Sequence, residues 1–456
     1  MLIHTANGDS RLSFWRRVRE FAVPPSMIET ATARRLAGDW AGACAAAGFD
    51  LDFTPRAVAR AHGRELAARV RADLRLLAPD LLRWHMPRIA PDGLLRPGLT
   101  LALARYDGAR HPVHLVVRTA PAWADAGQRL SLAVWSRSDG ESRHHPHPRP
   151  DRRFRLDLHR HLWDAGRADE LRVRSGAAGA PHPEASVVVP PEPGCAVGRW
   201  AAEAALVLDA AGRPRPTGTV LVRLGGRRRL ALELDGDGGG AGPPAMRITR
   251  APTGGGVSGL PVLPEAATWV LPDLELLRTG ALEADRLHPL VAAALVPGPP
   301  PAAPARGADP AGQPRLVECR GARHRIALVD GVLAALDHDP DEIRREELLT
   351  ALSGTPLPCL QEIDRAHRRP ECLDGVRERL NHGDITGALA VVEGLLGPEA
   401  VLRDGALRDA LDAAARRRIT YGLFRAGLVG PGPTRVRPKD RRPGLLRSHP
   451  RHTSPR

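Results

Sequence analysis

Lysine is almost absent from this chain of 456 residues: Lys439 is the only one, and every other Lys or Arg position is arginine. A phosphate-binding loop of the Walker type needs a glycine-rich turn followed by lysine, so the sequence excludes that nucleotide site. Abundant alanine, glycine and proline accompany the arginine, as is typical of GC-rich codon usage. The net charge of +14 is therefore weak evidence for a polyanionic partner.

Cysteines and long apolar runs are also scarce. The five cysteines show no CxxC spacing, which favours a reducing compartment and argues against a structural zinc site. The longest apolar stretches, such as residues 290–296, are far shorter than the roughly 20 residues that cross a bilayer. The start of the chain lacks the pattern of a secretory signal. We expect a cytoplasmic protein that has no membrane partner.

The common catalytic motifs are missing. The sequence contains no HExxH, no dinucleotide-binding fingerprint and no kinase set, and the glycines around Ser258 are out of register for a nucleophile elbow. These absences lean toward a chain that is not an enzyme and holds no cofactor or metal. A site assembled from distant residues stays open.

Residue patterning predicts an α+β fold. Helical spacing dominates a first region, residues 1–98, in which Thr54 caps one long amphipathic helix that runs to Pro79. Alternating apolar and polar residues in 99–296 predict a central antiparallel β-rich region, with a hairpin at Asp107-Gly108 and further strands. The further strands include residues 129–135 and 153–159, and a second hairpin turns at Gly225-Gly226.

Segments without periodicity divide the rest of the chain. Residues 176–194 and 235–264 read as flexible connectors, and 297–314 reads as a Pro/Ala/Gly linker. The helical spacing of residues 269–295 predicts a terminal helical segment before that linker. We expect 315–430 to form a helical C-terminal domain that the chain enters through a β-hairpin, and 431–456 to form a disordered basic tail.

The acidic stretch around Pro340 resembles a helix start more than a metal site. Asp339 can cap, Pro340 can take the first helical position, and Glu342 completes a capping box. Only Asp337 and His338 remain unassigned, whereas a cation site needs three or more converging ligands.

A near-repeat is the most informative pattern. Both "RLAGDWAGACAAAG", from Arg35, and "RLNHGDITGALAVVEG", from Arg379, contain Gly-Asp-x-x-Gly-Ala. The turn followed by Ala388 and Val392 resembles the turn and second helix of a tetratricopeptide hairpin, as do Gly38, Asp39, Ala43 and Ala47. The first helix lacks that family's aromatic pattern and no tandem array follows, so the resemblance implies a helical hairpin only. In composition, the chain resembles uncharacterised actinobacterial cytoplasmic proteins, which implies no activity.

Histidines gather between residues 144 and 161. His144, His145 and His147 lie in a Pro/Arg-rich segment, so a metal site there is the weaker interpretation. His159 and His161 alternate with leucines, which predicts the solvent-exposed face of a strand.

These observations favour a protein-interaction or scaffold role with an unknown protein partner. The expected interface residues are aromatic or lie near the second Gly-Asp turn: Trp40, His382, Ile385, Tyr421 and Phe424. The alternative for Trp40, Ile385 and Phe424 is core packing.

Two other classes stay open. A nucleic-acid-associated protein would use the tail weakly and without sequence specificity, since no aromatic residue follows Pro431; its contacts would be Arg435, Arg437, Lys439, Arg441 and Arg442. An enzyme would place Asp337 and His338 against Arg323 or Arg325 in one pocket.

Overall fold

The computed structural model describes most of the chain in two compact units. The first unit is Met1–Pro300 with Thr420–Arg456, and the second is Pro301–Ile419. The described residues are 8–107, 111–124, 126–137, 145–176, 194–212, 217–225, 228–235, 245–251, 259–296, 315–319, 322–329, 332–335, 339, 341, 344–345, 348–349, 371–396 and 405–428.

Helices open the first unit, as the sequence predicts. Trp15 and Val18 bury one face of the first helix, and the Thr54 hydroxyl accepts from the Ala57 amide at 3.2 Å. The single helix expected up to Pro79 is wrong, because Gly63 adopts φ +92° and ends one helix before the next begins. The helices are α1 (Gly8–Phe21), α2 (Pro25–Leu36), α3 (Trp40–Ala46), α4 (Pro55–His62), α5 (Arg64–Leu76) and α6 (Pro79–His85).

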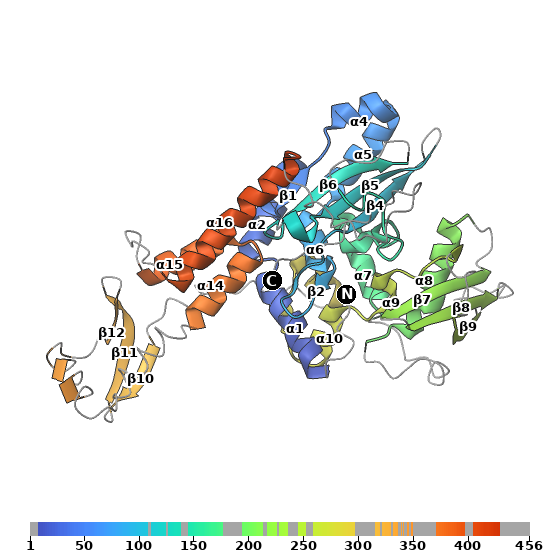
Figure 1. Cartoon of the computed structure of the whole chain (residues 1–456). Helices are drawn as coiled ribbons and strands as arrows, with labels where there is room; N and C mark the ends of the chain where they lie inside the picture. The colour runs from blue at the N-terminus through green and yellow to red at the C-terminus, as the bar shows by residue number, and fades with distance from the viewer. Residues whose placement is uncertain are drawn as a thin grey trace, which may run out of the picture. The chain divides into compact units, whose positions relative to one another are not determined.

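A four-stranded sheet follows in the order β1-β6-β5-β4. The predicted hairpin and its third strand are present as an antiparallel meander, and the short β1 adds to β6 in parallel, which the sequence did not show. The strands are β1 (Phe49–Leu51), β4 (Thr100–Tyr106), β5 (Val113–Thr119) and β6 (Leu130–Ser136), with a small hairpin of β2 (Arg88–Ile89) and β3 (Leu94–Leu95) (Figure 1).

The strand predicted at residues 153–159 is wrong. This segment continues into short 3-10 turns that bury His159 and His161, which are 1% and 2% exposed. The alternation of apolar and polar residues matched a strand by chance over a run too short to distinguish the two periods. The elements are η2 (Leu156–Leu158), η3 (Arg160–Leu162), η4 (Ala165–Glu170) and α7 (Leu171–Arg174).

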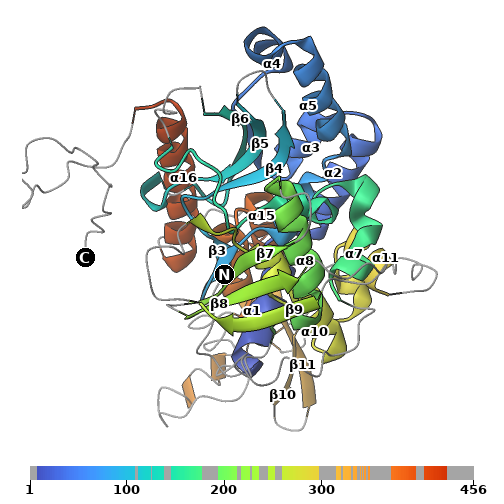
Figure 2. The same cartoon turned by 90° about the vertical axis from the view of Figure 1, so that its right-hand side faces the viewer.

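A second layer of the first unit has its own core. Helix α8 (Val197–Ala210) packs Trp200 and Leu208 against one face of a three-stranded antiparallel sheet (Figure 2). That sheet comprises β7 (Gly218–Gly225), β8 (Arg228–Asp235) and β9 (Ala245–Arg250). Strand β9 lies inside the segment 235–264 that we expected to be a connector, so that expectation is wrong there.

Short helices complete the first unit. Prolines divide the predicted helical stretch 269–295 into pieces, since Pro272 and Pro289 each start a new helix. The pieces are α9 (Glu265–Thr268), α10 (Pro272–Arg278), η7 (Ala284–Arg286) and α11 (Pro289–Leu295). The main core draws on residues from Phe14 to Leu295, on both sides of residue 98.

The second unit begins with three antiparallel strands, β10 (Arg315–Cys319), β11 (Ala322–Val329) and β12 (Val332–Ala335). The Asp339 carboxylate then accepts from the Asp341 amide at 3.0 Å, as expected of a helix cap. The helices that follow are α14 (Glu371–Asn381), α15 (Ile385–Leu396) and α16 (Ala406–Arg425), whose last residues belong to the first unit. The α+β fold with helical N- and C-terminal regions is confirmed. None of the described helices is long and apolar enough to cross a bilayer.

The two Gly-Asp turns have the same geometry. Gly38 and Gly383 adopt φ +79° and +85°, and the next residue's carboxylate accepts from the glycine amide three positions on, at 2.8 and 2.9 Å. A Cβ on Gly42 or Gly387 would strike that carboxylate, which explains the second glycine of the motif. In the first copy Arg34 pairs with the Asp39 carboxylate, and in the second copy Arg379 pairs with the Asp384 carboxylate. Each arginine lies five residues before its aspartate, so the counterpart of Arg379 is Arg34 and not Arg35.

Removing the second cap is expected to loosen α15. Asp384→Ala deletes the acceptor for the Gly387 amide and costs about 1 kcal/mol. Amides of residues 385–392 then exchange with solvent roughly fivefold faster in hydrogen-exchange mass spectrometry. Asp384→Asn retains an acceptor oxygen and serves as the control; equal exchange in both variants would contradict the capping role.

Candidate functional site

Several predicted site residues lie outside the described residues. Asp337 and His338 are among them, and so are the tail residues Arg435, Arg437, Lys439, Arg441 and Arg442. Arg323 and Arg325 lie on β11, in register with Glu318 and Leu316 of β10. The pocket proposed for these residues and the nucleic-acid role of the tail therefore stay predictions.

The expected interface residues lie at or beneath the surface of their own units. Trp40 packs partly buried against the main core, whereas His382 is 1% exposed and Ile385 packs against the helical core of the second unit. A protein-interaction role stays a prediction.

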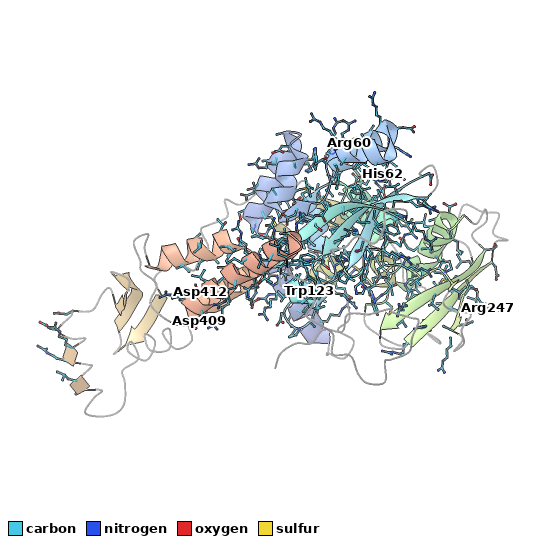
Figure 3. All side chains as sticks on the ribbon, turned by 45° about the horizontal axis from the view of Figure 1, so that its top comes forward. Arg60, His62, Trp123, Arg247, Asp409 and Asp412 are labelled. Atoms are coloured by element: carbon cyan, nitrogen blue, oxygen red, sulfur yellow. The ribbon has the colours of Figure 1, made fainter. Side chains whose placement is uncertain are left out.

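Tyr421 and Phe424 contact the first unit's sheet edge. The Tyr421 hydroxyl donates to Asp50 of edge strand β1 at 2.8 Å, and Arg129 donates two hydrogen bonds to the same carboxylate. Phe424 packs edge to face against Trp123, with 5.2 Å between the ring centroids. Trp123 is labelled in Figure 3. The end of α16 is thus fastened by its own aromatic residues.

The histidine cluster is structural where it is described. His144 is outside the described residues, and His145 contacts the Thr119 carbonyl at 3.0 Å while its other ring nitrogen accepts from the His147 amide. Burial lowers the pKa of His145 to about 4, so its ring is neutral at pH 7. Among the residues that the structure describes, no group of three or more possible metal ligands occurs.

A cavity of about 430 Å³ lies inside the first unit, where its two layers meet. Helices α1, α6, α8 and α10 and the segment after residue 153 supply its wall. Most of the lining is apolar and includes Leu12, Trp15, Leu101, Phe154, Leu171 and Leu271. The volume falls within the ~300–1,000 Å³ that small-molecule sites occupy.

Arginines interrupt this apolar wall, and most of them already hold a carboxylate. Ion pairs join Arg11 to Glu275, Arg19 to Asp273, Arg153 to Glu265, Arg155 to Asp157 and Arg174 to Glu203. Each of these guanidinium charges is compensated by the protein itself. They shape the wall without attracting a further anion strongly.

Arg199 is the exception among the partly buried wall arginines. It lies on α8, and its Nη2 donates to the carbonyls of Ala266 and Trp269 at 3.4 and 3.0 Å. Within the described residues no carboxylate forms an ion pair with it. Burial lowers the pKa of Arg199 to about 10, because desolvation opposes its charge. An anion in the cavity would supply the missing counter-charge.

Neither the family models, nor the curated proteins, nor the solved structures compared with this chain give a match. Roles for its residues come from its own geometry.

Glu203, the carboxylate whose charge acts on Arg199, forms its own ion pair and hydrogen bonds with other residues. Glu203, one helical turn along α8 and 3% exposed, accepts from Arg174 at 2.6 and 2.8 Å and from His159 at 3.1 Å. Although burial alone would raise the pKa of Glu203, these partners hold it well below its usual range. The His159 ring also contacts the Arg155 carbonyl at 2.9 Å.

A second buried network lies in the wall of the same cavity. Arg19 and Asp273 form two hydrogen bonds at 2.8 and 2.6 Å, and the Trp84 indole donates to Asp273 at 2.9 Å. The guanidinium of Arg19 lies over the Trp15 and Trp84 rings, 5.2 and 4.6 Å from their centroids. These contacts fix α1, α6 and α10 around the cavity.

Of the polar residues of this cavity the sequence interpretation singled out only His161, and it wrongly placed that residue on a solvent-exposed strand face. The cavity's polar residues are spread from Arg11 to Thr279, and in a chain this rich in arginine no single one stands out. One available signal was the helical spacing of Trp200, Ala204 and Val207 with Glu203 among them, since a carboxylate beside a buried stripe is normally paired.

Proposed function

We propose that this chain binds a small anionic molecule with a large apolar part, and that Arg199 binds its acidic group. The supporting observation is the contrast between Arg199, which lacks a carboxylate, and its five compensated neighbours on the same wall. An apolar wall favours a hydrophobic body, and a guanidinium prefers a carboxylate, sulfonate or phosphate. Arg278, exposed on the same lining, adds positive charge.

An amphipathic dye tests this proposal. Anilinonaphthalene sulfonate is expected to bind the folded protein with one-to-one stoichiometry. A fluorescence titration measures this binding. Arg199→Met removes a charge-assisted hydrogen bond worth about 1.5–3 kcal/mol, so the dissociation constant rises roughly 10- to 100-fold. The neutral analogue N-phenylnaphthylamine lacks the sulfonate, and its affinity is expected to stay within about twofold.

Arg71, exposed on α5, provides the matched control. Arg71→Met removes the same charge away from the cavity, and its affinity for the dye is expected to equal that of the wild type. Equal dye affinity in the Arg199 and Arg71 variants, both shown to be folded by thermal melting, would overturn the proposal.

A further inference from the structure

Besides the Arg199 cation, the lining of the cavity contains a hydrogen-bond acceptor, the carboxylate of Glu275. This residue lies on α10 with its side chain 17% exposed, and its Oε1 accepts from Arg11 at 2.8 Å. Its Oε2 is buried and has no hydrogen-bond partner among the described residues. A buried carboxylate oxygen without a donor is costly, so a donor in the cavity would stabilise it.

Two other buried carboxylates that pair with wall arginines, Glu203 and Asp273, have no such vacancy. Both oxygens of Glu203 and both oxygens of Asp273 accept hydrogen bonds from protein donors. In Glu275, by contrast, Oε1 accepts from Arg11 while Oε2 has no donor among the described residues. Burial raises the pKa of Glu275 in spite of Arg11 and Arg278, which is consistent with a carboxylate short of donors.

Two neutral imidazoles add further unpartnered polar atoms to the cavity lining. His85 and His161 line the same cavity, and each has one buried ring nitrogen without a partner in the described part of the chain. Burial lowers the pKa of His85 to about 3 and that of His161 well below its usual range, so both rings are uncharged at pH 7. A neutral imidazole either donates or accepts at the unpartnered nitrogen.

We infer that the ligand is amphoteric: an apolar compound that carries an ammonium or another strong donor as well as its acidic group, as an apolar α-amino acid or its short peptide does. This inference rests on the proposed function, since Arg199 holds the acidic group while Glu275 receives the donor. A plain apolar acid would compensate Arg199 and leave the Glu275 oxygen unsatisfied. A zwitterion satisfies both groups and brings no net charge into the cavity.

Competition against the bound dye tests the ligand class. Tryptophan and 3-indolepropionate differ only in the α-ammonium group, so their ratio of inhibition constants measures the effect of the donor. Tryptophan is expected to displace the dye at concentrations about tenfold lower. In Glu275→Gln, which retains an acceptor for Arg11 but loses the charge, the ratio is expected to fall below about threefold.

Glu65→Gln, a change at an exposed position on α5, is the control and keeps the wild-type ratio. The inference is overturned if indolepropionate competes as well as tryptophan, if neither competes while the dye still binds, or if Glu275→Gln keeps the wild-type preference. In each case the anion site itself stands. Failure of the dye to depend on Arg199 is a separate result and removes the proposed function.

Discussion

Replacing Glu203 with alanine is expected to lower the free energy of unfolding by about 3–5 kcal/mol. The change leaves Arg174 and the buried His159 ring without the carboxylate that both contact. It also releases α8, which carries Arg199, from the main core. Urea denaturation followed by tryptophan fluorescence measures the loss, because Trp200 lies on the same helix. A loss below 1 kcal/mol would contradict this role.

The pH dependence of stability separates charge from packing at Glu203. Its pKa is lowered in the folded chain from a usual value of 4.5, so its stabilisation is complete above about pH 4.5 and is lost as pH falls further. Glu203→Gln retains the shape of the side chain and lacks this component. The stability difference between the wild type and Glu203→Gln is therefore expected to be largest near neutral pH and to shrink below pH 4.5. A difference that is constant with pH would show that packing alone matters.

Asp273→Ala is expected to destabilise the protein by a similar amount, about 3–5 kcal/mol. Arg19 is 5% exposed and would keep its charge between two tryptophan rings after losing both hydrogen bonds to Asp273. The Trp84 indole would lose its acceptor as well. Chemical denaturation measures this effect, with the exposed change Glu65→Gln as the reference.

The double variant Arg19→Met with Asp273→Leu checks the cause of that loss. It removes both charges and fills the space with apolar atoms, so it is expected to recover much of the stability that Asp273→Ala loses. If the double variant is as unstable as the single one, the damage comes from altered packing and the unpaired charge is not its source.

Local patterns in the sequence predicted local structure well. The cap at Thr54 and both Gly-Asp turns depend on residues only a few positions apart, and the meander from β4 to β6 shows as alternation within each strand; the structure contains each of them. The errors arose where a short pattern fits two structures. Residues 153–159 alternate as a strand does, yet lead into turns in which His159 is buried and contacts Glu203 of α8, and nothing in those seven residues reveals this partner.

Local sequence patterns could not predict the candidate site, and the reason is physical. Its decisive contacts join residues far apart in the chain: 254 positions separate Arg19 from Asp273, and 264 separate Arg11 from Glu275. Whether an arginine is compensated depends on which carboxylate the fold brings to it. Arg174 pairs with Glu203, whereas Arg199 reaches only backbone carbonyls among the described residues, and this difference cannot be seen before the fold is known.

Anomalous X-ray diffraction from crystals soaked in 4-iodobenzoate tests the anion site most directly. The iodine marks the apolar body, and the refined carboxylate shows which cation holds it. We predict one iodine peak inside the cavity, with the carboxylate within hydrogen-bond distance of the Arg199 guanidinium, and no such peak in Arg199→Met crystals soaked alike. An empty cavity in the wild type, or an unchanged iodine peak in the variant, would contradict the assignment of Arg199 as the anion-binding residue.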